Sequence, residues 1–295
     1  MKNKKLLGHM IAFIAITFWG ITFVSTKILL NYIEPIEIMI SRFTLAYLIL
    51  LIAYPKFSKF KSFKDEFIFF LAGTFGLTLY FIFEILALER TTASNVAILI
   101  SSAPILTAIL AHIFTGDEKF NKGLLIGFIV SISGIVLVIF NDTFNFDMNV
   151  TGSLLAIAAA ISCSSYLVIL KRVGRSYNRI VVTRKVFLYG ILTSIPFAVI
   201  LRPDINYKTF LIPEVYLHLL FLGIIASALC FFLWNVALNY IGAIKLSAYT
   251  YLLPLVGMIA SVIFLGEKIT IIMTIGGVLI LTGTYLSENT NRTKK

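Results

Sequence analysis

Charged residues are scarce in this chain, and their scarcity excludes most classes of protein. Only 13% of the 295 residues are Asp, Glu, Lys or Arg, whereas a soluble domain carries roughly 25%. Apolar side chains make up 59% of the chain, and the mean hydropathy is +0.96. A soluble domain and a disordered chain are therefore excluded. The composition predicts an integral membrane protein.

Cysteine and histidine are also rare, which argues against several kinds of chemistry. Cys163 and Cys230 lie inside apolar runs, so they indicate core residues and not a disulfide framework. His9, His112 and His218 lie near the ends of such runs, without the spacing of metal ligands. There is no Walker A sequence, which excludes ATP-driven pumping within this chain. We expect no metal, no cofactor and no enzymatic activity.

Long apolar runs account for nearly the whole sequence. About 20 apolar residues span a bilayer core of about 30 Å, so each run is long enough for one membrane crossing. The runs are continuous and do not alternate in polarity, which favours helices over a transmembrane barrel. Ten such runs are recognised, at about residues 8–28, 36–54, 67–88, 94–114, 122–140, 150–170, 180–201, 214–238, 244–265 and 269–287.

The net charge of +11 predicts an orientation in the membrane. If the ten runs cross in turn, nineteen of the 25 Lys and Arg residues lie on the side of the N-terminus and six on the other side. The positive-inside rule then places both termini in the cytoplasm, in a multi-pass protein of the cell membrane. The basic residues form no single patch, so nucleic acid is not an expected partner. The first run continues to about Ile28, so it indicates a retained span and not a signal peptide.

The chain also repeats itself at a shift of about 150 residues. We predict a first repeat over 1–140, an extracytoplasmic linker over 141–149 and a second repeat over 150–295. Each repeat holds five helices, and an odd number inserts the second copy upside down relative to the first. The expected fold is all-α, with ten transmembrane helices as two inverted five-helix repeats. The matches include Gly73 with Gly223, Ala87-Leu88 with Ala237-Leu238, Pro104 with Pro254 and, after a slip of one residue, Glu118-Lys119 with Glu267-Lys268.

These residues resemble a known family, the ten-helix drug/metabolite transporters built from two EamA domains, which include YddG-like exporters. The resemblance rests on "AITFWGITFVSTK", "EILALERTTASNVAILISSAPILTAILAHIFTGDEK" and "WNVALNYIGAIKLSAYTYLLPLVGMIASVIFLGEKIT". It implies a central cavity lined mainly by the first, third, fourth, sixth, eighth and ninth helices, and transport out of the cell. One departure is Cys163, which stands where the first half has Trp19, so the two halves differ chemically.

Two charges interrupt the apolar runs at similar depth, Arg42 and Glu84. An unpaired charge is costly inside a bilayer, so we expect these two side chains to form an ion pair. The alternative is that they extend to the headgroup region. In the functional interpretation Glu84 binds a substrate amine or acts as a proton-coupling site.

Aromatic and polar side chains on the helices assigned to the cavity are candidate substrate contacts. Such a lining suits an apolar or amphipathic solute. The alternative for the aromatic residues is packing, and for the serines and Asn95 it is hydrogen bonding between helices. Besides Glu84, the candidates are Trp19, Thr22, Tyr80, Asn95, Ser101, Ser102, Tyr166, Trp234, Asn235, Tyr249 and Tyr251.

Pro104 and Pro254 lie at matching places in the two halves, where each removes a helical backbone hydrogen bond. We interpret them as candidate gating hinges, with a static kink as the alternative.

The leading hypothesis is a secondary transporter that moves a small organic metabolite, such as an amino acid, by alternating access. A passive channel, and an importer or exchanger of the same fold, are the alternatives. The expected partners are the substrate, the lipid bilayer and, for a coupled carrier, protons. The oligomeric state stays open, with a monomer among the alternatives.

Overall fold

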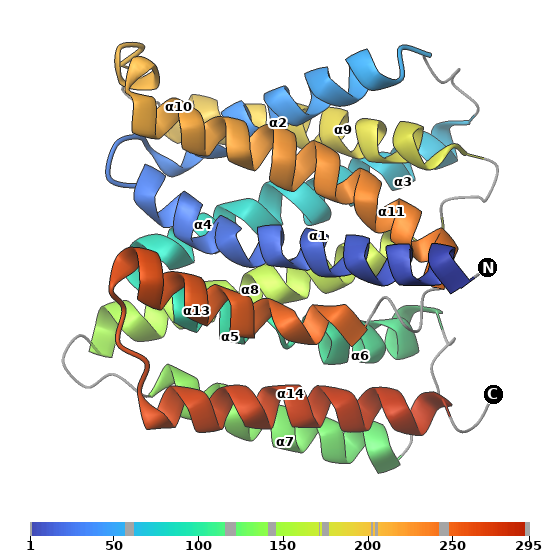
Figure 1. Ribbon diagram of the computed structural model, residues 1–295, viewed down its shortest axis with the longest axis vertical. Coiled ribbons are helices and arrows are strands. Elements are labelled where there is room, and N and C mark those ends of the chain that lie inside the picture. Colours follow the sequence, from blue (N-terminus) through green and yellow to red (C-terminus); the bar gives the residue numbers. More distant parts are fainter. Residues whose placement is uncertain are drawn as a thin grey trace.

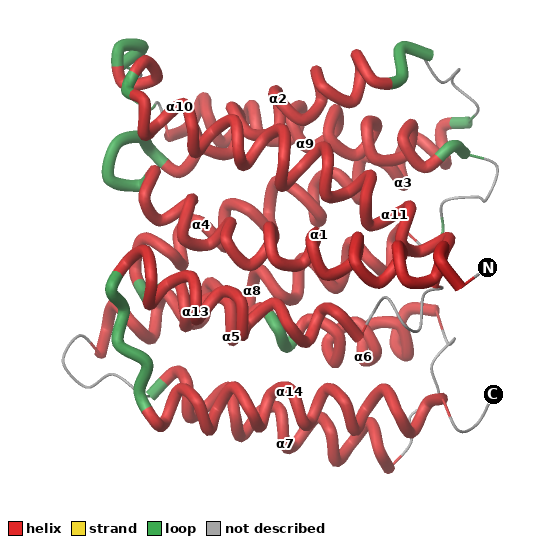
Figure 2. The backbone as a smooth tube through the Cα atoms, viewed as in Figure 1, coloured by secondary structure: helices red, strands yellow, loops and turns green. Residues whose placement is uncertain are grey.

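The computed structural model describes residues 2–56, 62–115, 122–140, 146–170, 172, 177–201, 203, 206–241 and 248–292. These residues form helices and connections, with no strand among them (Figure 2). Segments labelled η are π-helical or 3-10-helical. In chain order the elements are α1 (Lys2–Leu29), α2 (Pro35–Ala53), α3 (Phe63–Gly73), η1 (Thr74–Leu79), α4 (Tyr80–Arg90), α5 (Ala93–Ile100), α6 (Ala103–Thr115), α7 (Lys122–Ile139), α8 (Phe146–Leu170), α9 (Arg179–Leu201), η2 (Thr209–Leu211), α10 (Pro213–Leu220), η3 (Phe221–Leu229), α11 (Cys230–Ile241), η4 (Ala248–Leu252), α13 (Leu253–Leu265) and α14 (Ile271–Arg292).

The apolar runs of the sequence correspond to these helices. Seven helical stretches of the described chain are long and apolar enough to cross a membrane. Three shorter apolar helices, Leu125–Ile139, Leu253–Leu265 and Ile271–Leu286, occupy the remaining predicted runs. Helices suit this composition because each satisfies its own backbone hydrogen bonds in a medium without water. The all-helical fold class is therefore confirmed.

Several helices are interrupted at places where the sequence predicts a continuous helix. The third and eighth runs each contain a π-helical segment, η1 and η3, and the fourth run breaks at Ser101–Ser102 between α5 and α6. α8 begins at Phe146, within the predicted linker 141–149 and four residues before the predicted start of the second repeat. The other residues of the linker, 141–145, lie outside the described residues.

The helices run side by side as one bundle (Figure 1). α1 begins and α14 ends at the same end of the bundle, which we call the terminal end. At the opposite end, the far end, residues 30–34 connect α1 to α2 and residues 266–270 connect α13 to α14. The α1–α2 connection ends in a capping box, in which the Glu34 backbone N–H donates to the Glu37 carboxylate at 2.8 Å. α7 and α14 pair along one edge of the bundle (Figure 1).

Glycines let α7 and α14 approach closely. A Cβ atom added to Gly134 would lie 2.5 Å from the Gly276 carbonyl oxygen, and one added to Gly276 would lie 2.6 Å from Val138. Small residues permit such close contact between membrane helices. The glycines at 134 and 276 therefore serve the packing of α7 against α14.

Contacts between the two halves recur in pairs that are related by a shift of about 150 residues. α1 packs against α11 and α13, while α8 packs against α4 and α6. In the same way α2 packs against η3, and α9 packs against η1. The breaks correspond as well: η1 and η3 end at Leu79 and Leu229, and α6 and α13 begin at Ala103 and Leu253.

Candidate functional site

Arg42 is a buried cation in the middle of α2. Its side chain is 4% exposed, and its Nε donates a hydrogen bond to the Ser227 hydroxyl of η3 at 2.9 Å. The guanidinium carbon also lies 4.3 Å from the centre of the Phe81 ring, within the range of a cation–π interaction. The structure thus holds this charge between α2, η3 and α4.

Glu84 is the matching buried anion, on α4. It is 1% exposed, and its Oε2 atom has no hydrogen-bond partner among the residues that the structure describes. The Tyr80 hydroxyl and the Arg42 charge both interact with its carboxyl group. However, no nitrogen–oxygen contact within 4.0 Å joins Arg42 and Glu84. The direct ion pair predicted from the sequence is therefore not formed, because Ser227 and Phe81 hold the guanidinium instead.

The two π-helical segments position this pair. Glu84 lies one turn after η1, and Ser227 lies inside η3. A π-helical segment inserts an extra residue into a turn, and such segments are frequent at functional sites. Gly76 of η1 lets α8 approach, since a Cβ atom there would lie 2.6 Å from the Cγ of Tyr166. Cys163, one turn earlier on α8, is partly exposed and lies within electrostatic range of Glu84.

An aromatic cluster lies on the other side of η3. The ring of Trp19 lies 5.0 Å from that of Trp234 and 5.5 Å from that of Phe231, measured between centroids. The Trp19 indole donates a hydrogen bond to the Ala226 carbonyl oxygen at 2.9 Å. Ala226 precedes the serine that holds Arg42, so η3 connects the aromatic cluster to the buried charges. The structure therefore brings the two predicted tryptophans together.

Other predicted site residues form contacts within or between helices. The Thr22 hydroxyl donates to the Trp19 carbonyl at 2.6 Å, and the Asn95 amide donates to the Thr91 hydroxyl at 3.1 Å. Ser101 and Ser102 donate to carbonyl groups of α5 at 2.5 and 2.7 Å. The bonds of Thr22, Ser101 and Ser102 each reach back three residues along the chain, so they do not join separate helices, and a role of these residues in substrate binding stays a prediction.

The remaining predictions fall at the edge of the described structure. Tyr249 lies toward the terminal end, where its hydroxyl is 2.8 Å from Nδ1 of His9. It is therefore not part of the Arg42–Glu84 group. The side chains of Asn235 and Tyr251 lie outside the described part of the structure.

Pro104 and Pro254 do not interrupt helices as predicted. Each is the second residue of its helix, α6 or α13. The N–H groups of a first helical turn have no partner within the helix, so proline removes no helical bond there. The chain is already broken before each proline, by Ser101–Ser102 in one half and by the 3-10-helical η4 in the other.

Sequence reasoning missed Phe81 and Ser227, which hold the guanidinium of Arg42. Phe81 has no distinguishing signal among the many aromatic residues of the chain. Ser227 has one, because it is the polar residue of the otherwise apolar segment "FLGIIASAL".

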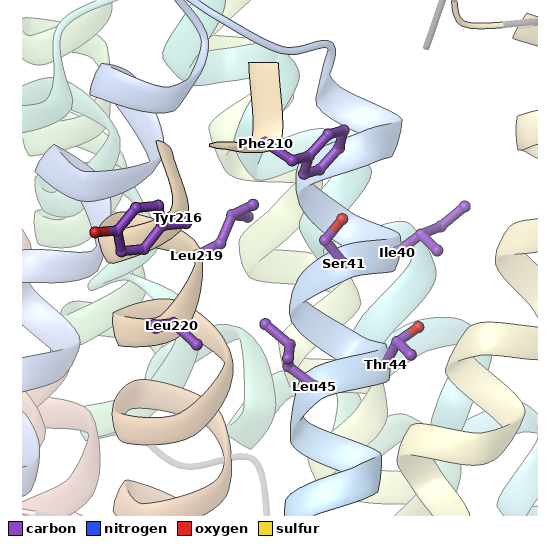
Figure 3. A pocket seen from close by; sticks show the side chains of 8 residues that line it. All are labelled: Ile40, Ser41, Thr44, Leu45, Phe210, Tyr216, Leu219 and Leu220. Atoms are coloured by element: carbon purple, nitrogen blue, oxygen red, sulfur yellow. The ribbon is translucent and has the colours of Figure 1, made fainter. Parts of the chain in front are cut away.

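An open groove of about 420 Å³ lies between α2 and α10 (Figure 3). It lacks charged side chains, and its polar groups are the hydroxyls of Ser41, Thr44 and Tyr216. In a membrane this surface suits lipid chains better than a polar solute. It is therefore not the candidate site. The lining residues are Ile40, Ser41, Thr44, Leu45, Phe210, Tyr216, Leu219 and Leu220.

A comparison with known proteins identifies the family to which this bundle with buried charges belongs. The EamA-like transporter family matches residues 6–140 and 150–288, which is most of the chain. This chain belongs to the EamA-like transporter family. The protein is therefore a multi-pass membrane transporter of the drug/metabolite superfamily, and the family resemblance of its motifs is confirmed.

Curated relatives of this EamA-like protein match over nearly their whole length. An uncharacterized transporter of Archaeoglobus fulgidus is 29% identical over 95% of this chain and 96% of its own. A probable amino-acid metabolite efflux pump of Escherichia coli is 26% identical over 94% of this chain and 93% of its own. One solved crystal structure aligns with a TM-score of 0.66 at 20% identity, over 97% of this chain and 98% of that one. This last likeness concerns the fold alone.

Proposed function

We propose that this EamA-like protein is a secondary transporter that exports a small organic metabolite across the cell membrane. The observation that carries the proposal is the unpartnered Oε2 atom of Glu84, which is 1% exposed on a membrane-spanning helix. A buried polar group without a partner is costly, and native structures rarely keep one without a functional reason. A substrate ammonium group or a proton supplies the missing partner.

The side chains near Glu84 indicate which chemical class of solute this site would bind. Arg42 presents a cation that suits a carboxylate, and Trp19 and Trp234 offer apolar faces across η3. A molecule with an amine, a carboxylate and an apolar part satisfies all three features. An amino acid or a similar amphipathic solute fits this description. The relatives named amino-acid metabolite efflux pumps support both this class and the outward direction.

We further propose that transport occurs by alternating access between two inverted repeats, 1–140 and 150–295. In this proposal the seven long and three short apolar helices form ten spans, and the positive-inside rule places both termini in the cytoplasm. The contact pairs that recur 150 residues apart support two equivalent packings, one open to each side. The breaks before Pro104 and Pro254 are the corresponding places for bending.

The test uses purified protein in proteoliposomes. Metabolites that accumulate in the medium of producing cells, relative to cells without the gene, supply the candidate solutes for counterflow. Glu84→Gln removes the charge with little change of volume, and we expect it to lower counterflow at least about tenfold, as loss of a buried charged contact does. Glu89→Gln is the matched control, because Glu89 is an exposed carboxylate near the end of the same helix.

Two outcomes contradict parts of the proposal. Counterflow by Glu84→Gln at an unchanged rate and pH dependence removes Glu84 from substrate binding and proton coupling. Flux that is neither saturable nor stimulated by solute on the opposite side indicates a channel and overturns alternating access. An imposed pH gradient separates a proton-coupled exporter from an exchanger, because only the former responds to it.

A further inference from the structure

A carboxylate from the second half caps a helix of the first half at the far end of the bundle. Glu267 follows the last residues of α13, after Gly266 in the left-handed conformation with φ 64°. Its carboxylate accepts hydrogen bonds from the backbone N–H groups of Ala93 at 2.8 Å and Ser94 at 3.0 Å. It also accepts one from the Ser94 hydroxyl at 2.7 Å. One side chain thus joins the end of α13 to the start of α5.

The bonding is strong for physical reasons. The first N–H groups of a helix have no partner within it, and the helix dipole favours an anion at that end. Hydrogen bonds to an ionised acceptor are stronger than neutral ones. The hydroxyl of Thr92, the usual capping residue, accepts only from Asn95, so Ala93 and Ser94 depend on Glu267.

A third helix, α1, is also hydrogen-bonded near the start of α5. The Lys27 ammonium group of α1 donates a hydrogen bond to the Thr91 carbonyl oxygen, at the end of α4. Its charge also acts on Glu267. α13 packs directly on α1 and α5 (Figure 1). These three helices would therefore have to separate for solute to pass the far end between the two halves.

We propose that Glu267 is a releasable latch that holds the far end of the transport pathway closed. This inference rests on the proposed alternating access. In the closed arrangement Glu267 binds the start of α5, and opening requires these hydrogen bonds to be exchanged for water. Glu267 is partly exposed, so it lies at the surface of the bundle and not in its core.

The test measures opening directly and needs no substrate. Thr22→Cys provides a reporter on α1, five residues before Lys27 and about 7–8 Å deeper in the membrane. The two native cysteines are replaced, by Cys163→Ser and Cys230→Ala. Intact cells are treated with a membrane-impermeant maleimide, and the labelling rate of position 22 is followed. We expect Glu267→Gln to raise this rate at least about tenfold, because the amide nitrogen cannot accept a hydrogen bond.

Matched variants separate a latch from a static contact. Glu89→Gln removes an exposed carboxylate near the same end and is expected to leave the labelling rate unchanged. Ser94→Ala removes only the hydroxyl donor and is expected to raise the rate about threefold, by the loss of a single hydrogen bond. Ser94→Ala keeps every charge, so it decides the question if Glu267→Gln does not fold.

The outcomes are distinct from those for the proposed function. An unchanged labelling rate in Glu267→Gln and Ser94→Ala, with or without a loss of thermal stability, overturns the latch even if counterflow is normal. A raised labelling rate in a protein that shows no counterflow with any solute supports the latch and contradicts the proposed function.

Discussion

The two π-helical segments, η1 and η3, end at positions 150 residues apart and are followed by different side chains. Shifted by 150 residues, Tyr80 and Glu84 after η1 correspond to Cys230 and Trp234 after η3. The first half thus supplies a buried carboxylate, where the second supplies an indole in contact with Trp19. The π-helical segment recurs in the second half, and the buried carboxylate does not. A doubled backbone suits movement between two packings, whereas a single charge suits one shared site.

The first prediction has the largest expected effect and tests the difference in charge between the two halves by removing the cation Arg42. Arg42→Met leaves Glu84 buried without a neighbouring positive charge, which costs about 3–5 kcal/mol of the free energy of unfolding. Thermal unfolding of the purified protein in detergent measures the effect. The double variant Arg42→Met/Glu84→Gln is expected to be more stable than the single one, since it removes both of these buried charges and leaves neither without the other.

The control for that experiment lies at the corresponding position of the second half. Leu192 follows Arg42 by 150 residues and is exposed on α9. We expect Leu192→Met to change stability by less than about 1 kcal/mol. Equal losses in Arg42→Met and Leu192→Met would show that the asymmetry of charge has no energetic consequence.

The second prediction concerns α7 and α14, the final helices of the two halves. A Cβ atom on Gly276 would meet Val138 at 2.6 Å and the Gly134 carbonyl oxygen at 2.9 Å. Gly276→Ala is therefore expected to cost about 1–3 kcal/mol in stability, since the helices must separate. Gly277→Ala is the matched control, because its nearest neighbour, Ile98, is 3.6 Å away. Thermal unfolding that ranks Gly277→Ala as the less stable variant contradicts this packing.

The third prediction has the smallest expected effect and distinguishes the roles of Trp19 and Trp234. Trp19→Phe removes the hydrogen bond to the Ala226 carbonyl, a loss of about 1 kcal/mol that corresponds to roughly fivefold in apparent substrate affinity. Trp234→Phe keeps a ring against Trp19, and the described structure contains no hydrogen bond from its indole, so we expect a smaller change. Counterflow at varied solute concentration measures both. The opposite ranking would assign Trp234 the more direct contact.

The spans could be predicted from the sequence because their signal is local. A run of apolar residues in a bilayer must form a helix, whatever its neighbours are, since no other partner exists for its backbone. Gly134 and Gly276 carry a local signal too, since small residues permit close contact between membrane helices, but which glycines meet depends on the tertiary fold. α8 begins at Phe146, before the apolar run that starts at about residue 150, because its first turns contain polar residues such as Asp147 and Asn149.

The candidate site was only partly predictable. Arg42 and Glu84 were recognised because charges within apolar runs are conspicuous, but their separation depends on Ser227 and Phe81, which belong to other turns and helices. Trp19 and Trp234 were proposed as members of one set, yet their contact requires α1 to lie against α11.

The sequence by itself determined that the segments are apolar membrane helices, that their pattern recurs in two halves, and that two charges, Arg42 and Glu84, lie within the apolar runs. The tertiary structure decided how the chemistry is arranged, because π-helical turns, helix contacts and capping bonds depend on distances between segments that no local pattern records. It held Arg42 away from Glu84 and left one carboxylate oxygen without a partner. It also brought Glu267 to the start of α5, 173 and 174 residues away along the chain.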